Sequence, residues 1–165
     1  MDLIDKKILK LLEKNARLSN EDIAVVAEIS EAEAGERIAR LEKDGVIRGY
    51  KGVIDWERVD PDRVSAIIEL KVTPQRDGGY DRVAEKIYNY PEVKDMYLMS
   101  GGFDFTVIIE GKSMKEVALF VAEKLACADG VLSTATHFVL RKYKTEGVIH
   151  GAKARVDERE KGFMI

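Results

Sequence analysis

Cysteine and histidine are scarce in this sequence, and their scarcity excludes several kinds of site. The chain of 165 residues has one cysteine, Cys127, and two histidines, His137 and His150. A single cysteine rules out an internal disulfide and any CxxC metal knuckle, and it is typical of a reducing compartment. Two histidines leave little material for a histidine-rich metal site or a nucleophilic catalytic site. We therefore expect no metal, no cofactor and a cytoplasmic location.

Long apolar runs and an excess of positive charge are also absent. No apolar stretch approaches the roughly 20 residues that a membrane-spanning helix needs, and the N-terminus shows no signal-peptide pattern, so we expect no membrane partner. The 27 Lys and Arg residues are outnumbered by 30 Asp and Glu residues, which gives a net charge of −3. Such a chain has no general electrostatic attraction to nucleic acid. Any prediction of nucleic-acid binding must therefore rest on a motif.

The first 47 residues have the apolar spacing of three short helices. The first helix is predicted from the cap at Asp2 to about Lys14, and the second begins at Ser19 or Asn20. Ser30 opens the third helix, with a glutamate at the capping-box spacing three residues later. The residues expected to face inward in the second and third helices are Ile23, Val26, Ala27, Ala34, Ile38 and Leu41. Three short helices with a tight second turn indicate a helix-turn-helix DNA-binding unit.

The exposed face of the third helix is unusual for such a unit. Its N-terminal half lacks the Arg, Lys, Asn and Gln side chains that commonly read base edges, and Glu36 remains as an acceptor for cytosine N4. Several basic residues nearby are predicted to position the phosphate backbone. The residues predicted to contact DNA are Arg17, Ala32, Glu36, Arg37, Arg40, Lys43 and Arg48. The alternative is a head that has lost its DNA-binding role and supports dimerisation only.

The rest of the chain predicts an α+β second unit. Alternating apolar residues predict strands at 64–72, 93–100, 103–110 and 131–140, and helical spacing lies between them, with Met114, Val117, Val121 and Leu125 facing inward in the second helix. This order is that of a ferredoxin-like βαββαβ domain, an antiparallel sheet with two helices on one face. We divide the chain into a winged-type helix-turn-helix at 1–47, a β-rich linker at 48–63, the ferredoxin-like domain at 64–145 and a tail at 146–165. Apolar residues on the open sheet face suggest burial against a partner.

This combination resembles the Lrp/AsnC (feast/famine) transcription factors. The motif R-I-x-x-L-E-x-x-G-V-I-x-G-Y at residues 37–50, followed by G-x-x-D at residues 101–104, carries the resemblance, together with residues 5–9, 15–17 and 134–140. In that family the second domain dimerises through its sheet, the dimers often assemble into octamers, and an amino acid or related effector binds between dimers. The resemblance implies an effector site at Gly101, Gly102, Asp104, Thr134 and Thr136.

Other interpretations of the same residues stay open. A Gly-Gly pair before an alternating strand is often a plain hairpin, with Asp104 solvated. The chain is predicted to be a DNA-binding regulator, and a small-molecule-sensing oligomer with a vestigial head is the alternative. The sirohaem decarboxylases resemble this layout too, but their resemblance would require His and Arg residues that are absent from positions 96–104. We therefore expect no catalytic residues.

Overall fold

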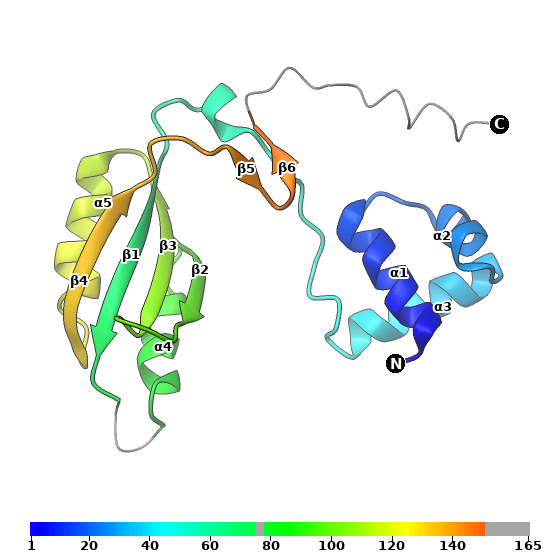
Figure 1. Cartoon of the computed structure of the whole chain (residues 1–165), viewed down its shortest axis with the longest axis horizontal. Coiled ribbons are helices and arrows are strands. Elements are labelled where there is room, and N and C mark those ends of the chain that lie inside the picture. The colour runs from blue at the N-terminus through cyan, green and yellow to red at the C-terminus, as the bar shows by residue number, and fades with distance from the viewer. Residues whose placement is uncertain (75–77, 151–165) are drawn as a thin grey trace. The chain divides into compact units, whose positions relative to one another are not determined.

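The computed structural model of the chain describes residues 1–74 and 78–150. The chain divides into two compact units, Met1–Val53 and the part from Ile54 onward (Figure 1). None of the helices in the described ranges combines the length and the apolar character that crossing a bilayer requires.

The first unit contains the three predicted helices, α1 (Leu3–Lys14), α2 (Asn20–Ala27) and α3 (Glu31–Lys43). Each helix begins at a polar side chain that accepts a backbone N–H from its first turn, and these caps are Asp2, Ser19 and Ser30. The core of the unit is formed by Ile8, Ile23, Ala24 and Ala34. The inward position predicted for Val26 is wrong, because this side chain is 47% exposed. In the short helix α2 the buried positions are those of Ile23, Ala24 and Ala27.

Helix α3 ends near Gly45, as the sequence predicts, with Lys43 as its last residue and Asp44 as its C-cap. This glycine has a φ of +68°, a left-handed conformation that other residues adopt at a cost. The N–H of Val46 donates to the carbonyl of Leu41, and the N–H of Gly45 donates to the carbonyl of Glu42, both at 2.9 Å. These two bonds define a Schellman motif, which satisfies carbonyls that the helix end would otherwise leave free.

The linker after α3 differs from the prediction. No strand lies between the end of α3 and Val64; the only regular element there is a 3-10 turn at Trp56–Arg58. The expected wing and the expected β-rich character of residues 48–63 are therefore not seen. A single extended segment cannot satisfy its own backbone hydrogen bonds, so an apolar, β-branched sequence alone does not make a strand.

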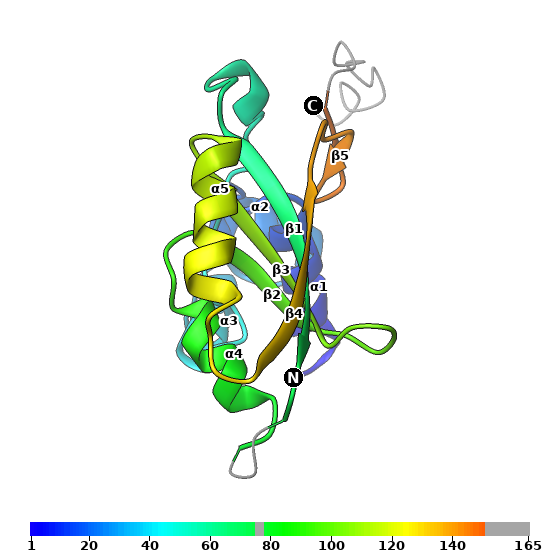
Figure 2. The same cartoon turned by 90° about the vertical axis from the view of Figure 1, so that its left-hand side faces the viewer.

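The second unit has the predicted ferredoxin-like order. Its strands are β1 (Val64–Val72), β2 (Val93–Leu98), β3 (Phe105–Gly111) and β4 (Val131–Phe138). They form one antiparallel sheet in the order β2-β3-β1-β4. Helices α4 (Asp81–Tyr88) and α5 (Met114–Phe120) cover one face, and the other face carries no helix (Figure 2). A π-helical turn, Val121–Leu125, continues α5.

The core of this unit lies between the sheet and its two helices. Strand β1 contributes the alternate residues predicted for it, and all of them are buried: Ala66, Ile68, Leu70 and Val72. From α5 and the turn that follows it, Val117, Val121 and Leu125 are buried as predicted. The inward position predicted for Met114 is wrong, because it begins the helix and is 54% exposed.

A small hairpin follows the sheet, at the boundary between the predicted ferredoxin-like domain and the predicted tail. Strands β5 (Lys144–Thr145) and β6 (Val148–Ile149) pair through a turn in which Glu146 and Gly147 both have positive φ. Two consecutive positive φ values are the geometry of a type I′ hairpin turn. Part of the predicted tail, residues 151–165, lies outside the described residues.

Candidate DNA-binding surface and effector site

The connection between α2 and α3 has the tight geometry of a helix-turn-helix. Glu28 ends α2 in the left-handed conformation, with a φ of 60°, and the N–H of Ile29 donates to the carbonyl of Ala24 at 3.1 Å. Ser30 then caps α3 directly. A Cβ added to Gly35 would lie 3.1 Å from the side-chain nitrogen of Asn20 at the start of α2. The glycine that weakens α3 as an isolated helix therefore lets the two helices approach closely.

The outward face of α3 is the one that the sequence predicts. Ala34 and Leu41 are buried and Ile38 is partly buried, and they mark the inner side of the helix. The exposed residues of the helix include Glu31, Ala32, Glu36, Ala39 and Lys43. The two residues proposed to face base edges, Ala32 and Glu36, are therefore accessible to a large ligand.

Arg37 is engaged within the unit instead of facing outward. Its guanidinium lies 2.7 Å from Asp2 Oδ2, 2.8 Å from Asp5 Oδ1 and 2.8 Å from Glu33 Oε1, and its side chain is 17% exposed. These three carboxylates raise the pKa of Arg37. The expected capping box of α3 is therefore half formed: Ser30 accepts the N–H of Glu33, but the Glu33 carboxylate binds Arg37. This arrangement speaks against the predicted phosphate contact of Arg37.

Asp5 is the centre of this network. It is 2% exposed, and its Oδ1 accepts from both Arg37 and Arg40 at 2.8 Å. Its Oδ2 accepts the backbone N–H of Asp2, and Asp2 in turn accepts the N–H of Asp5, as a reciprocal capping box. The side chain of Arg40 is 53% exposed, so part of its guanidinium remains accessible. The network thus fixes α3 to the first turn of α1.

The other predicted phosphate contacts lie outside the central turns of α3. Arg17 follows α1, Lys43 is the last residue of α3, and Arg48 follows the end of that helix; all three are exposed. They are the cations of the predicted set that carry no ion pair among the described residues. Exposed basic side chains of this kind position a duplex through its phosphates without reading sequence.

The predicted effector loop joins β2 to β3. The N–H of Met99 donates to the carbonyl of Asp104, and the N–H of Asp104 donates to the carbonyl of Leu70, both at 2.8 Å. Gly101 and Gly102 are exposed, and a Cβ added to either would meet no atom within 4 Å. The backbone of the loop is therefore accessible at its tip, as the prediction for a carboxylate ligand requires.

Asp104 has contacts that the sequence did not suggest. Its Oδ2 accepts the N–H of Val72 at 2.8 Å, and its Oδ1 accepts the hydroxyl of Tyr80 at 3.2 Å. The Val72 N–H faces β3 but has no ladder partner there, because the pairing of β1 with β3 ends at Leu70 and Phe105. The hydrogen bond to the carboxylate raises the pKa of Tyr80, whose ring also meets Phe105 edge-on at 5.8 Å. Asp104 thus holds the loop to β1 and is not a freely solvated carboxylate.

The two candidate threonines lie on another strand. Thr134 and Thr136 pair with Leu70 and Ile68, so their side chains face the helix-covered side of the sheet, and both are partly buried. Strand β1 separates their strand from β3 and from the loop with the two glycines. Adjacent strands lie about 4.8 Å apart, which places the threonines about 10 Å from the neighbouring end of β3. A single chain therefore does not bring the five predicted effector residues together.

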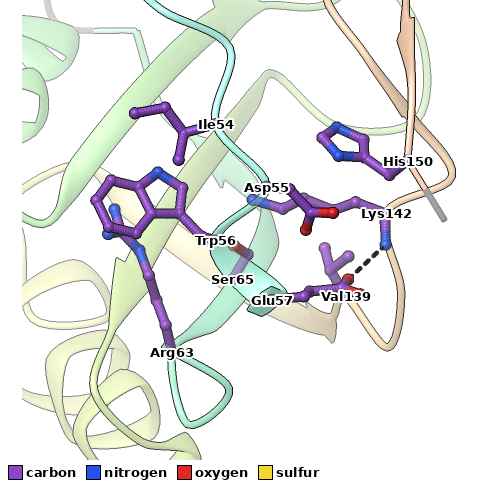
Figure 3. Close-up of a pocket in the computed structure, with 9 residues that line it drawn as sticks. All are labelled: Ile54, Asp55, Trp56, Glu57, Arg63, Ser65, Val139, Lys142 and His150. Atoms are coloured by element: carbon purple, nitrogen blue, oxygen red, sulfur yellow. Dashed lines mark hydrogen bonds between the residues drawn. The ribbon is translucent and has the colours of Figure 1, made fainter. Parts of the chain in front are cut away.

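A charged cluster around Glu110, at the start of β1, was not foreseen from the sequence; Figure 3 shows its partners Arg63, Ser65 and Lys142. The Glu110 carboxylate pairs with Arg63 and with Lys142, the latter at 3.2 Å, and accepts the hydroxyl of Ser65. Burial alone would raise the pKa of Glu110, but the two cations outweigh burial and lower it. The Arg63 guanidinium lies 4.3 Å above the ring of Trp56. Arg63, Ser65 and Lys142 line a small cavity, and the cluster joins β1, β3 and the segment after β4.

Within the part of the chain that the structure describes, no group of three or more His, Cys, Asp or Glu side chains is placed to hold a metal ion. The charges of the Glu110 cluster are largely compensated within it. We therefore interpret this cluster as a structural feature of the second unit.

Comparison with known proteins connects both units to one group of regulators. Residues 1–42 match the family model of the AsnC-type helix-turn-helix domain, and residues 65–149 match that of the Lrp/AsnC ligand binding domain. The chain is 47% identical to the HTH-type transcriptional regulator YugG of Bacillus subtilis over 152 residues, which cover 90% of this chain and 92% of that protein. It is 33% identical to the HTH-type transcriptional regulator FL11 of Pyrococcus furiosus, covering 87% and 92% of the two chains.

A solved structure is similar along nearly the whole chain. It is that of a transcriptional regulator from Neisseria meningitidis in complex with L-Met, with a TM-score of 0.71 and 26% identity. The match covers 88% of this chain and 93% of that one.

Proposed function

The chain belongs to the Lrp/AsnC family of transcriptional regulators, and from this premise we propose that an amino acid controls how it binds double-stranded DNA. The observation that carries the DNA-binding part is the α2–α3 turn, which leaves one face of α3 exposed. Arg17, Lys43 and Arg48 of the same unit are exposed and form no ion pair with a described residue. The match of residues 65–149 to a ligand binding domain supports the sensing part. The proposed role involves no catalysis.

In this proposal the outward face of α3 enters the major groove. Arg17, Lys43 and Arg48 contact phosphates, and the exposed part of Arg40 adds a fourth contact. Arg37 supports α3 from behind through its three carboxylates. Because each helix-turn-helix unit makes few phosphate contacts, one unit alone has modest affinity for DNA. Tight binding therefore requires several such units in one assembly.

The proposed effector is an amino acid that binds at the β2–β3 loop. Its carboxylate would bind the accessible backbone N–H groups at Gly101 and Gly102, where the loop has open space. Its ammonium group would compete with the Tyr80 hydroxyl for Asp104. Because Thr134 and Thr136 lie across β1 from this loop, we place them in the site through a neighbouring subunit. The L-Met complex of the Neisseria regulator supports this class of ligand.

The proposed assembly is a dimer formed through the open face of the sheet, with further association to an octamer. Ile67 on β1 and Tyr97 on β2 lie on that face and are 38% and 52% exposed. Burying these side chains against a second copy would remove apolar surface from water. Size-exclusion chromatography with light scattering tests the assembly, and a monomer at micromolar concentration would refute it.

The test of the regulator function is fluorescence anisotropy of the full-length protein with DNA from upstream of its own gene. We expect saturable binding that exceeds binding to scrambled DNA, weakens as salt is raised, and changes when pooled amino acids are added. A flat signal at low salt from a folded, oligomeric protein would refute DNA binding at that promoter. Binding of an amino acid in the same sample would then favour a small-molecule-sensing oligomer whose helix-turn-helix unit does not bind DNA.

A further inference from the structure

Glu36 is an unpaired carboxylate on the outward face of α3. It is exposed, and among the described residues it takes part in no hydrogen bond or ion pair. Glu33, one turn earlier, is neutralised by Arg37 at 2.8 Å. The acidic N-terminal half of α3 therefore contains two different kinds of glutamate, one that supports the helix and one that is free.

The cations nearest to Glu36 in the sequence are directed elsewhere. Arg37 binds Asp2, Asp5 and Glu33, and Arg40, which has the favourable i+4 spacing from Glu36, donates to Asp5. The buried Asp5 thus withdraws both guanidiniums toward α1. Among the residues that the structure describes, no cation pairs with Glu36, which is left as an acceptor.

A carboxylate can only accept hydrogen bonds, so in the major groove it distinguishes bases by the donors that they present. Cytosine presents the N4 amino group, a donor, whereas guanine presents N7 and O6 and thymine presents O4, all of which are acceptors. Adenine has a donor at N6, but the neighbouring N7 acceptor opposes a carboxylate. An acceptor-only side chain therefore selects cytosine partly by excluding the other bases.

The side chains one turn on either side of Glu36 are compatible with this reading. Ala32 and Ala39 are exposed on the same face and add only methyl groups, so they leave Glu36 room to approach a base edge. Methyl side chains also suit contact with the thymine methyl group. The phosphate attraction that offsets the repulsion of Glu36 comes from the exposed cations of the same unit, Arg17, Lys43 and Arg48.

We propose that Glu36 is a specificity-determining residue that accepts a hydrogen bond from the N4 amino group of one cytosine in each half-site. This inference rests on the proposed DNA binding. It assigns base recognition to the Glu36 carboxylate. It assigns a positioning role to Arg37, which holds α3 against the first turn of α1.

The test is selection of binding sites from randomised duplex DNA with the full-length protein, followed by anisotropy on the selected duplex and on base-pair substitutions. We compare the wild type with Glu36→Ala and Glu36→Gln. Alanine has the higher helix propensity and the site is exposed, so both variants are expected to fold. Glu13→Ala is the matched control, because it removes the same charge from an exposed position on α1.

For the wild type we expect one C·G pair per half-site that binds about tenfold better than T·A at that position. Glu36→Ala should abolish this preference and leave the other positions unchanged, and Glu36→Gln should shift it toward A·T, whose N6 and N7 suit an amide. The control should behave like the wild type. An undiminished preference in Glu36→Ala would overturn the inference while DNA binding stands. A wild type that selects DNA without a C·G position would overturn it as well, and a wild type that binds no DNA would overturn the proposed function itself.

Discussion

Asp104 has two roles to separate in the effector loop: its hydrogen bond to β1 and its proposed contact with the ammonium group of the effector. If the carboxylate holds the loop to β1, its removal leaves the N–H of Val72, a residue only 4% exposed, without a partner. An unsatisfied buried donor costs about 1–3 kcal/mol, so we expect Asp104→Ala to lower the free energy of unfolding of the second unit by about 2 kcal/mol. Asp104→Asn keeps a carbonyl oxygen for Val72 and should cost about 1 kcal/mol or less.

The sole tryptophan makes this measurement specific to the second unit. Trp56 lies in that unit beneath Arg63, so its fluorescence during urea unfolding reports on the second unit and not on the helix-turn-helix. A loss of 2 kcal/mol shifts the urea midpoint by about 1 M when the slope is about 2 kcal/mol per molar urea. The control is Asp129→Ala, which removes an exposed ion pair with Lys86 and should leave the midpoint nearly unchanged.

An Asp104→Ala protein as stable as the wild type would refute this reasoning, because it would show that the Val72 bond does not hold the loop. The Asp104→Asn protein separates this structural role from effector binding. If it keeps its stability but loses the response of DNA binding to amino acids, the result supports the proposed contact between Asp104 and the effector ammonium group.

Three further variants test the helix-turn-helix unit. Lys43→Ala removes an exposed cation and should reduce the slope of log affinity against log salt concentration by about 1. Arg37→Ala should instead lower the thermal unfolding midpoint and leave that slope unchanged. Equal slope changes in the two variants would contradict a phosphate contact for Lys43 and a structural role for Arg37. Gly45→Ala places a side chain at a φ of +68° and should lower the free energy of unfolding by about 1–2 kcal/mol. Thermal unfolding followed by circular dichroism measures this loss, and an unchanged midpoint would argue against the Schellman motif at the end of α3. The N–H of Asp5, and then Arg37, lower the pKa of Asp2 from 3.8 to about 2. The resulting stability is complete above pH 3.8 and is lost as the pH falls toward 2, so an Asp2→Asn protein with the same acid unfolding curve would refute this contribution.

Most helices and strands were predictable from the spacing of their apolar residues, because burial of one face imposes a period of 3.6 on a helix and of 2 on a strand. Strand β1 shows this most simply, with every predicted inward residue buried. The two wrong inward positions, Val26 and Met114, lie near helix ends, where the packing of the whole helix decides which side is covered. The missing wing has a related cause, because strand formation depends on a partner that local sequence does not supply.

The contacts of the candidate sites were less predictable. Of the three partners of Arg37, only Glu33 lies at a helical spacing, while Asp2 and Asp5 are 35 and 32 residues away. Likewise, the bond from Val72 to Asp104 depends on where the pairing of β1 with β3 ends, which no local pattern predicts. A charged residue can therefore be recognised from sequence as a candidate, but its partner is known only from the packed structure.

The same network that orients α3 also determines what α3 offers to DNA. By drawing Arg37 and Arg40 toward α1, the buried Asp5 removes positive charge from the centre of the outward face and leaves Glu36 there. In the proposed complex with DNA, the centre of the face contributes selectivity more than attraction, and the attraction comes from a few exposed cations of the unit. Under this proposal, tight binding requires several helix-turn-helix units that bind together. An effector that changes the assembly of the second unit would then change DNA binding without touching the first unit, which is how two compact units joined by a strandless linker can act as one regulator.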